Sequence, residues 1–243
     1  MSGYVMKSKQ GIYARFLKRP LDLICSLAAL IVLSPVLVIL SIIGAIAMQG
    51  NPFFVQRRPG RIDARTGIER IFPLIKFRTM SNRKDAAGNL LPDEQRLNAY
   101  GRWLRSTSLD ELPSLICIVM GWLAIVGPRP QLVRDMVFMT EEQRHRHDVR
   151  PGLTGLAQVN GRNNITWERK FEYDLQYVEN ITFLGDVKII FQTIGKVLKR
   201  SDTVREGTAS DLDFGDWLLQ KGSVSETVYT ENQEKAEKIL VRQ

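Results

Sequence analysis

The amino-acid sequence predicts a mostly helical α+β protein with an N-terminal helix that enters a membrane. Three observations carry this expectation. The run from Leu23 to Met48 is apolar and contains no charged residue. Two short β-prone runs follow at 53–55 and 70–78, with polar, glycine-containing sequence between them. Apolar residues then recur at helical spacing over 167–198. In chain order, these segments predict a membrane helix, a small β-hairpin and a helical domain.

The composition bounds the class of protein. With 243 residues, the chain is long enough for one compact domain and a modest appendage. Its formal net charge of +8 indicates an anionic partner, whether nucleic acid, anionic lipid or a phosphorylated substrate. Cys25 and Cys117 are the only cysteines, and both lie in apolar runs. A disulfide framework or a zinc site therefore has no support, and a reducing compartment is expected.

The apolar run is long enough to cross a bilayer. A helix from Leu23 to Met48 extends roughly 39 Å, whereas the hydrocarbon core measures roughly 30 Å. The run is about twice as long as the apolar region of a signal peptide, which disfavours cleavage. Pro35 follows Ser34 in its middle, where proline removes a backbone hydrogen bond and predicts a kink or a break.

Two topologies remain open for this helix. Basic residues flank it on both sides: Lys7, Lys9, Arg15, Lys18 and Arg19 before it, and Arg57, Arg58 and Arg61 after it. A spanning helix usually has one flank poorer in positive charge. A re-entrant helix that turns at Ser34-Pro35 places both flanks on the cytoplasmic side. The residues alone do not choose between the two.

The chain divides into three parts. Residues 1–50 form the basic N-terminus and the membrane helix, and residues 51–200 are expected to form a cytoplasmic helical domain with the hairpin. From 201 to 243 the composition becomes polar, which predicts a loosely attached extension that closes with a short helix from Glu231.

Four segments of the central domain have a predicted structure. The polar stretch 81–100 is typical of a loop that leads into a helix around 94–104. The apolar segment 112–126 suits a buried helix better than a second membrane span, because it is short and interrupted by proline and glycine. Helical spacing at 167–177 and 183–198 predicts two helices that face the core, with contact to anionic lipid as the alternative for the second.

The most informative local string is Ser108-Leu109-Asp110-Glu111-Leu112-Pro113, directly before an apolar segment. Its structural interpretation is a capping box made by Ser108 and Glu111 at the head of a helix. The same position keeps a carboxylate ionised, as a nucleophile or a Mg²⁺ ligand that faces phosphate must be. The two interpretations are compatible.

Basic residues around this acidic pair are candidates for phosphate binding: Lys76, Arg78, Arg102, Arg105, Arg129, Arg150 and Arg162. Each alone is typical of a solvated surface. Arg129 and Arg162 lie in loops bounded by proline or glycine, where rigid backbone presents a planar guanidinium to a diphosphate. P-loop and Rossmann chemistry lack support, because neither glycine fingerprint is present. His145 and His147 are too few for a metal cage and are expected at the surface.

Taken in order, these strings resemble the bacterial sugar transferase family, the small monotopic polyprenyl-phosphate phosphoglycosyl transferases that begin capsule, exopolysaccharide and glycoprotein glycan assembly. The resemblance runs from about Lys18 to Arg200. It is carried by Lys18-Arg19-x-x-Asp22, Leu33-Ser34-Pro35, Phe53-Phe54-x-Gln56-x-Arg58-x-Gly60, Lys76-Phe77-Arg78-Thr79-Met80, Leu104-Arg105, Ser108 to Pro113, Val126 to Pro130, Pro151-Gly152-x-Thr154-Gly155-x-Ala157-Gln158-Val159-x-Gly161-Arg162-Asn163, and Asp174 with Tyr177.

The resemblance implies a two-step reaction. Asp110 would attack the sugar-linked phosphate of a UDP-sugar, expel UMP and carry a covalent phosphosugar, which polyprenyl (undecaprenyl) phosphate then collects. Mg²⁺ at Asp110 would neutralise diphosphate charge, and Glu111 would complete the acidic dyad. The substrate-binding residues that the resemblance implies are Lys76, Arg78, Arg105, Arg129, Arg162 and Asp174.

The resemblance also favours the re-entrant topology. The membrane helix would be broken at Ser34 and Pro35, and the site would lie on the cytoplasmic face of the bacterial inner membrane. One stretch departs from the family pattern: where relatives usually have Asn-Val-Leu-x-Gly-Asp-Met-Ser-Leu, this chain has apolar residues at the polar positions of 117–125. If the usual polar residues only cap or pack, activity survives; if they order the site, the rate or specificity changes.

Three other functions are weighed against this one. A non-catalytic membrane scaffold would use the acidic pair only to cap a helix. A conventional glycosyl transferase would release UDP instead of UMP. A nucleic-acid binder is disfavoured, because the basic residues are spread along the chain and aromatics are few. The identity of the sugar, the polyprenyl length and the oligomeric state, a homo-oligomer included, stay open.

Overall fold

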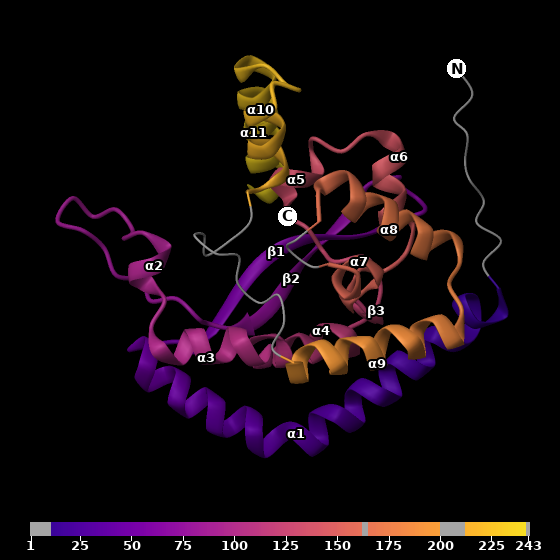
Figure 1. Cartoon of the computed structure of the whole chain (residues 1–243), viewed down its shortest axis with the longest axis horizontal. Helices are drawn as coiled ribbons and strands as arrows, with labels where there is room; N and C mark the ends of the chain where they lie inside the picture. The colour runs from indigo at the N-terminus through magenta and orange to yellow at the C-terminus, as the bar shows by residue number, and fades with distance from the viewer. Residues whose placement is uncertain (1–10, 162–164, 200–211, 242–243) are drawn as a thin grey trace.

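A computed structural model describes residues 11–161, 165–199 and 212–241. It confirms a mostly helical chain with one long apolar N-terminal helix and a small antiparallel hairpin (Figure 1). The elements in chain order are η1 (Tyr13–Leu17), α1 (Lys18–Met48), β1 (Phe53–Ile62), β2 (Glu69–Phe77), α2 (Asp93–Arg96), α3 (Ala99–Thr107), η2 (Leu109–Ser114), α4 (Leu115–Val119), β3 (Ala124–Val126), α5 (Val133–Met136), α6 (Glu141–Arg144), η3 (His145–Asp148), β4 (Gly152–Thr154), α7 (Leu156–Val159), α8 (Trp167–Glu179), α9 (Phe183–Lys199), α10 (Phe214–Gln220) and α11 (Glu226–Val241).

Helix α1 continues through Pro35 instead of ending there. Figure 1 shows the helix bent near its middle and running beneath α3, α4 and α9. The interruption expected at Ser34-Pro35 is thus a bend and not a division into two helices. The Ser34 hydroxyl donates to the carbonyl of Ile31 at 2.8 Å, one turn earlier. Together with η1, α1 is long and apolar enough to cross a membrane, and Ile31 and Val32 are each 74% exposed.

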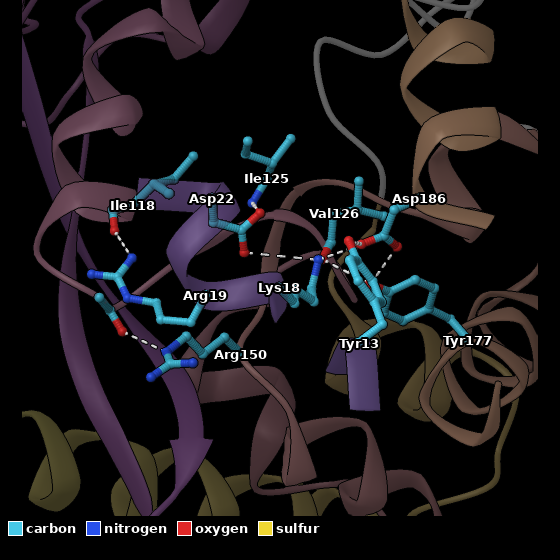
Figure 2. Close-up of polar contacts among 11 residues, drawn as sticks. Tyr13, Lys18, Arg19, Asp22, Ile118, Ile125, Val126, Arg150, Tyr177 and Asp186 are labelled. Atoms are coloured by element: carbon cyan, nitrogen blue, oxygen red, sulfur yellow. Dashed lines mark hydrogen bonds and ion pairs between the residues drawn. The ribbon is translucent and has the colours of Figure 1, made fainter. Parts of the chain in front are cut away.

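The N-terminal end of α1 is tied to the central domain by charge. Figure 2 shows Lys18 between two carboxylates, 2.6 Å from Asp186 on α9 and 3.8 Å from Asp22 on its own helix. Arg19 donates to the backbone carbonyls of Ile118 and Val119, at 2.6 and 2.9 Å. These bonds fix the start of α1 against α4 and α9.

The C-terminal end of α1 is tied to the same domain through α3. The Tyr100 hydroxyl donates to the Leu40 carbonyl at 2.8 Å, and the Asn98 amide donates to the Ala47 carbonyl at 3.0 Å. Leu40 packs there with Phe77 and Leu104. Both ends of α1 are therefore held by one domain.

The hairpin β1–β2 is longer than the runs that predicted it, with Phe53 opposite Phe77 and Ile62 opposite Glu69. Its inner face contributes Phe72 and Leu74 to a core that α4 completes with Cys117 and Ile118. Because successive residues of a strand face opposite sides, Lys76 lies on the same face of β2 as Phe72 and Leu74, two residues beyond Leu74.

A second, parallel pair of strands escapes sequence reasoning. Ala124 pairs with Gly152 and Val126 with Thr154. The contact requires glycine, because a Cβ on Gly152 would lie 2.1 Å from the backbone nitrogen of Gly127. The pairing places the loop that follows β3, which contains Arg129, against the loop before β4.

Segment 112–126 does not form the long buried helix that was expected. The 3₁₀ turn η2 and the short helix α4 are followed by a reversal at Gly121, whose φ is +81°, and by strand β3. Glycine adopts this left-handed conformation without the steric cost that other residues carry. The interrupting residues that argued against a second span also end the helix.

The predicted helices at 167–177 and 183–198 are confirmed as α8 and α9, but the core-facing expectation is wrong for most of α9. Only Asp186 and Ile189 are buried on this helix. Leu184 and Leu198 are 77% and 78% exposed. An apolar period shows that a helix has an apolar face, but it does not show whether protein or lipid covers that face.

The C-terminal extension is not loosely attached where the structure describes it. Phe214 is buried among Met139, Trp167 and Phe171. Ala236 on α11 is buried in a separate cluster against α5. Helix α11 begins at Glu226, earlier than the predicted start at Glu231. The buried contacts of Phe214 and Ala236 show that residues 212–241 pack against the rest of the protein.

Candidate active site

The acidic pair lies in η2, directly after α3. Ser108 has a left-handed conformation with φ of 56°, which turns the chain from α3 into η2. Ser114 is buried at the end of η2, and its hydroxyl donates to the Ile75 carbonyl of β2 at 2.7 Å. The expected capping box is wrong, because the Ser108 side chain forms no cap hydrogen bond and Glu111 is engaged elsewhere.

Glu111 is bound by two cations from two other elements. Lys76 Nζ of β2 lies 2.7 Å from Glu111 Oε1, and Arg129 Nη2 lies 3.1 Å from the same oxygen. Burial raises the pKa of Glu111, but Lys76 and Arg129 outweigh it and hold that pKa far below its usual range. Glu111 is therefore a fixed negative charge that orients two cations.

Asp110 is in a different state from its neighbour. Within the described residues, its carboxylate forms no hydrogen bond. Burial and the negative charge of Glu111 raise the pKa of Asp110 to about 6, while Lys76, Arg129 and Arg105 act in the opposite direction. The carboxylate is mostly ionised at neutral pH, is near three cations and has oxygens free for a substrate. These are the properties of a nucleophile toward phosphorus.

Arg105 is positioned by a close helix-to-loop contact. A Cβ on Gly101 would lie 1.9 Å from the Thr79 carbonyl oxygen, so glycine lets α3 touch that backbone. Arg105 Nε, one turn later, donates to the Thr79 hydroxyl at 3.1 Å. Burial lowers the pKa of Arg105. The nearby negative charge of Asp110 raises that pKa, which shows that the two side chains interact electrostatically.

A cavity of about 960 Å³ connects these side chains. It is lined by the dyad and by five of the six residues predicted to bind substrate, namely Lys76, Arg78, Arg105, Arg129 and Asp174. Arg162 lies outside the described residues. None of the residues 117–124 lines the cavity. These residues, which depart from the family pattern, instead pack in the core beside the site, where Cys117 is buried and Trp122 contacts Phe72.

Asp174 lines the cavity, but its carboxylate is already paired. Arg146 donates to Asp174 Oδ2 from Nε at 3.0 Å and from Nη2 at 2.6 Å. The same Nη2 donates to the Arg129 carbonyl at 2.6 Å. Both members of the pair are almost fully buried. A role for Asp174 in substrate binding stays a prediction, and its contacts show it supporting the loop that carries Arg129.

Sequence reasoning missed Arg146 and misplaced His147. His147 was expected at the surface, but it is buried and its Nδ1 lies 3.1 Å from Glu69 Oε1. Arg144 binds both oxygens of Glu69 from the other side, at 2.8 and 2.6 Å. A run of basic residues is most often a solvated surface, and nothing in its spacing showed that an acidic partner lay on β2.

The donor set fits a single Mg²⁺ ion bound together with a diphosphate. Groups of three or more metal-binding side chains are not found in the described part of the chain. Asp110, however, presents a carboxylate without a hydrogen-bond partner there, whereas Glu111 Oε1 is saturated by Lys76 and Arg129. Mg²⁺ commonly binds through one or two carboxylates, substrate phosphates and water. Asp110 is thus the residue that would hold the ion.

Comparison with known proteins gives an independent view of the chain. The sequence model of the bacterial sugar transferase family matches residues 13–200. The chain is 47% identical to the uncharacterized sugar transferase EpsL of Bacillus subtilis over 184 residues, which are 75% of this chain and 87% of that protein.

Two longer relatives have more specific names. The chain is 33% identical over 205 residues to the undecaprenyl-phosphate galactose phosphotransferase of Salmonella typhimurium, covering 77% of this chain and 41% of the relative. It is 35% identical over 189 residues to the UDP-glucose:undecaprenyl-phosphate glucose-1-phosphate transferase of Klebsiella pneumoniae, covering 74% and 39%. The chain thus spans about two fifths of the length of these two proteins.

Proposed function

The chain belongs to the bacterial sugar transferase family, and from this premise we propose that it transfers a sugar phosphate from a UDP-sugar to polyprenyl phosphate with release of UMP. One observation carries the proposal. The Asp110 carboxylate, which forms no hydrogen bond within the described residues, lines a cavity of about 960 Å³ with Lys76, Arg105 and Arg129. The names of the longer relatives, which include undecaprenyl phosphate with galactose or glucose, support the substrate classes.

The reaction proceeds in two displacements at one phosphorus atom. In the first, an Asp110 oxygen bonds to the sugar-linked phosphorus, and the bond from that phosphorus to the bridging oxygen breaks. UMP leaves with the electron pair. In the second, a phosphate oxygen of polyprenyl phosphate bonds to the same phosphorus and Asp110 leaves as a carboxylate. A weakly basic carboxylate is a good leaving group, which makes the second step feasible.

The fixed cations stabilise the charge that develops on the transferred phosphoryl group. Lys76 and Arg129 are held in place by Glu111 before the substrate arrives, and preorganised charge of this kind is the largest contribution in phosphoryl transfer. Mg²⁺ bound at Asp110 would supply further neutralisation of the diphosphate. Glu111 acts in this scheme by organising cations and not as a general base.

We also propose that α1 is re-entrant, with the site on the cytoplasmic face of the inner membrane. Asp186 and Ile118 hold its first turn, and Tyr100 and Asn98 hold its last turns, so one domain binds both ends. Helix α9, which Lys18 of α1 contacts through Asp186, carries exposed apolar side chains such as Leu184 and Leu198, and these extend the surface that lipid would cover.

Cysteine accessibility tests this topology. Cysteines at Gly11, where a Cβ has no atom within 4 Å, and at Arg65, whose side chain is 87% exposed, flank α1. In a Cys25→Ser background, both are expected to react with a membrane-impermeant maleimide only after the inner membrane is permeabilised. Labelling of either one in intact spheroplasts would establish a spanning helix.

Nucleotide release tests the reaction. The detergent-solubilised protein with Mg²⁺ and polyprenyl phosphate is expected to release UMP from at least one donor in a panel of UDP-sugars. Release of UDP would establish a conventional glycosyl transferase. No nucleotide release from any donor would favour the scaffold function.

A further inference from the structure

We propose that Asp213, at the start of the C-terminal extension, contacts the sugar of the donor and determines which UDP-sugar is used. The inference rests on the proposed function, since it concerns the donor of that reaction. Asp213 lies beyond residue 200, where the family match ends, and the extension was given no role by the sequence. The donor chemistry assigned to this contact is a hexose hydroxyl or amide N–H group.

The extension is held against the catalytic domain by specific hydrogen bonds. Asp135 of α5 accepts from the Phe214 backbone nitrogen at 2.8 Å through one oxygen and from the Leu132 nitrogen at 3.1 Å through the other. Trp167 Nε1 donates to the Leu212 carbonyl at 3.2 Å. With Phe214 buried beside Trp167, these bonds fix Leu212 and Asp213 in one place.

That place is the wall of the catalytic cavity. Leu212 and Asp213 line the same cavity of about 960 Å³ as Asp110 and Glu111. A segment outside the family match therefore completes the space in which the donor must lie. Asp216, one turn later on α10, does not line the cavity.

Arg58 lies between the acidic dyad and the extension. Burial and the nearby Arg129 lower the pKa of Arg58 to about 10, and the charges of Asp135, Asp213 and Glu111 oppose this shift. Its Nη1 donates to the Pro130 carbonyl at 3.2 Å. Its Nε is buried and has no hydrogen-bond partner within the described residues. The Arg58 side chain also lines the cavity.

The chemistry at this wall suits a sugar. Asp213 Oδ2 lies 3.2 Å from Arg134 Nη1, which keeps the carboxylate oriented. A carboxylate accepts hydrogen bonds from hydroxyl and amide groups, and Arg58, which lines the same cavity, carries guanidinium donors nearby. A hexose offers both donors and acceptors, and a site that pairs with a particular hydroxyl rejects an analogue that lacks it.

The sugar is favoured over the nucleotide because of what the relatives share. The two longer relatives are named for galactose and for glucose, whereas UDP is common to the donors of the proposed reaction. The common nucleotide is suited to the region that the family shares, which ends at residue 200. Leu212 and Asp213 lie beyond residue 200, and this part of the cavity wall is therefore suited to the sugar, which is the part of the donor that varies.

A matched pair of variants tests the inference. Asp213 and Asp216 both bind Arg134, at 3.2 and 2.9 Å, but only Asp213 lines the cavity. With UDP-glucose, UDP-galactose and their N-acetylamino counterparts, Asp213→Asn is expected to change the ratio of kcat/KM between the preferred and second donor by about tenfold or more. Asp216→Asn is expected to leave that ratio unchanged. Asp213→Glu is expected to retain most of the wild-type preference between the two donors.

Donor affinity supplies a readout that does not need turnover. Dissociation constants for the same donors, measured in an Asp110→Asn background, are expected to show the same change with Asp213→Asn. Equal effects of Asp213→Asn and Asp216→Asn on the relative donor affinities would show that Asp213 only holds α10 in place through Arg134, and would overturn the inference. A change in UMP affinity with unchanged sugar preference would place Asp213 at the nucleotide and also overturn it. If the wild type releases no UMP, the proposed function fails, and the affinities still decide whether Asp213 discriminates sugars.

Discussion

Replacing Asp110 with asparagine is expected to lower the rate of UMP release by at least about 1,000-fold, because it removes a covalent nucleophile. The amide has nearly the same shape as the carboxylate but does not form the acyl phosphate. Within the described residues the Asp110 carboxylate has no hydrogen bond to lose, so the fold is expected to remain intact. The measurement is UMP release with the preferred donor, together with the apparent melting temperature.

Glu94→Gln is the matched control for this variant. Glu94 is exposed on α2 and does not line the cavity, so its rate is expected to stay within about threefold of wild type, since exposed substitutions away from a site have small effects. A rate for Asp110→Asn above a tenth of wild type would rule out Asp110 as the nucleophile and leave it as a metal or substrate ligand.

Replacing Arg146 with methionine is expected to lower the free energy of unfolding by about 3–5 kcal/mol. The change leaves the carboxylate of Asp174 buried without its partner, which is 2.6 Å away in the intact protein. Burial then raises the pKa of Asp174 without opposition from Arg146. For a chain of this size, the loss corresponds to a fall of about 10 °C in melting temperature. Activity falls as well, because Arg146 also holds the Arg129 carbonyl.

The double variant Arg146→Met with Asp174→Leu separates the ion pair from simple packing. Replacing both members of a buried pair by apolar residues is much less destabilising than removing one. The double variant is therefore expected to melt above the Arg146→Met single variant, while activity stays low because the Arg129 carbonyl has lost its donor. Additive losses from the two single changes would contradict an interaction between them.

Local sequence patterns predicted the elements whose residues interact with near neighbours. The uncharged run predicted α1, the β-prone runs on either side of a polar, glycine-containing stretch predicted β1 and β2, and the helical period predicted α8 and α9. The acidic dyad was also found, because Asp110 and Glu111 are adjacent in sequence. These features need no knowledge of distant parts of the chain.

The features that were missed depend on distant contacts. The pair β3–β4 has three residues in each strand and forms only because Gly127 and Gly152 allow their backbones to approach. Arg146 belongs to a basic run that is typical of a surface, and its partner Asp174 lies on α8. A short strand and a basic run carry no local signal of such partners.

The extension was misjudged because its composition is mostly polar. Its attachment depends on a few anchors, with Phe214 and Ala236 buried and Arg134 binding Asp213 and Asp216. A few apolar residues in a polar stretch predict weak packing. Whether they meet complementary pockets is decided by the surface of α5 and α8, which the sequence of the extension does not describe.

The most direct test of the covalent mechanism is the intact mass of the protein after incubation with Mg²⁺ and its preferred UDP-sugar, without polyprenyl phosphate. About one UMP per protein is expected to be released, with a mass increase of one sugar phosphate that peptide mapping then locates on the peptide containing Asp110. Asp110→Asn shows neither, and added polyprenyl phosphate removes the mass increase from the wild type. UMP release that requires polyprenyl phosphate, with no mass increase before it is added, would contradict the account and establish direct transfer.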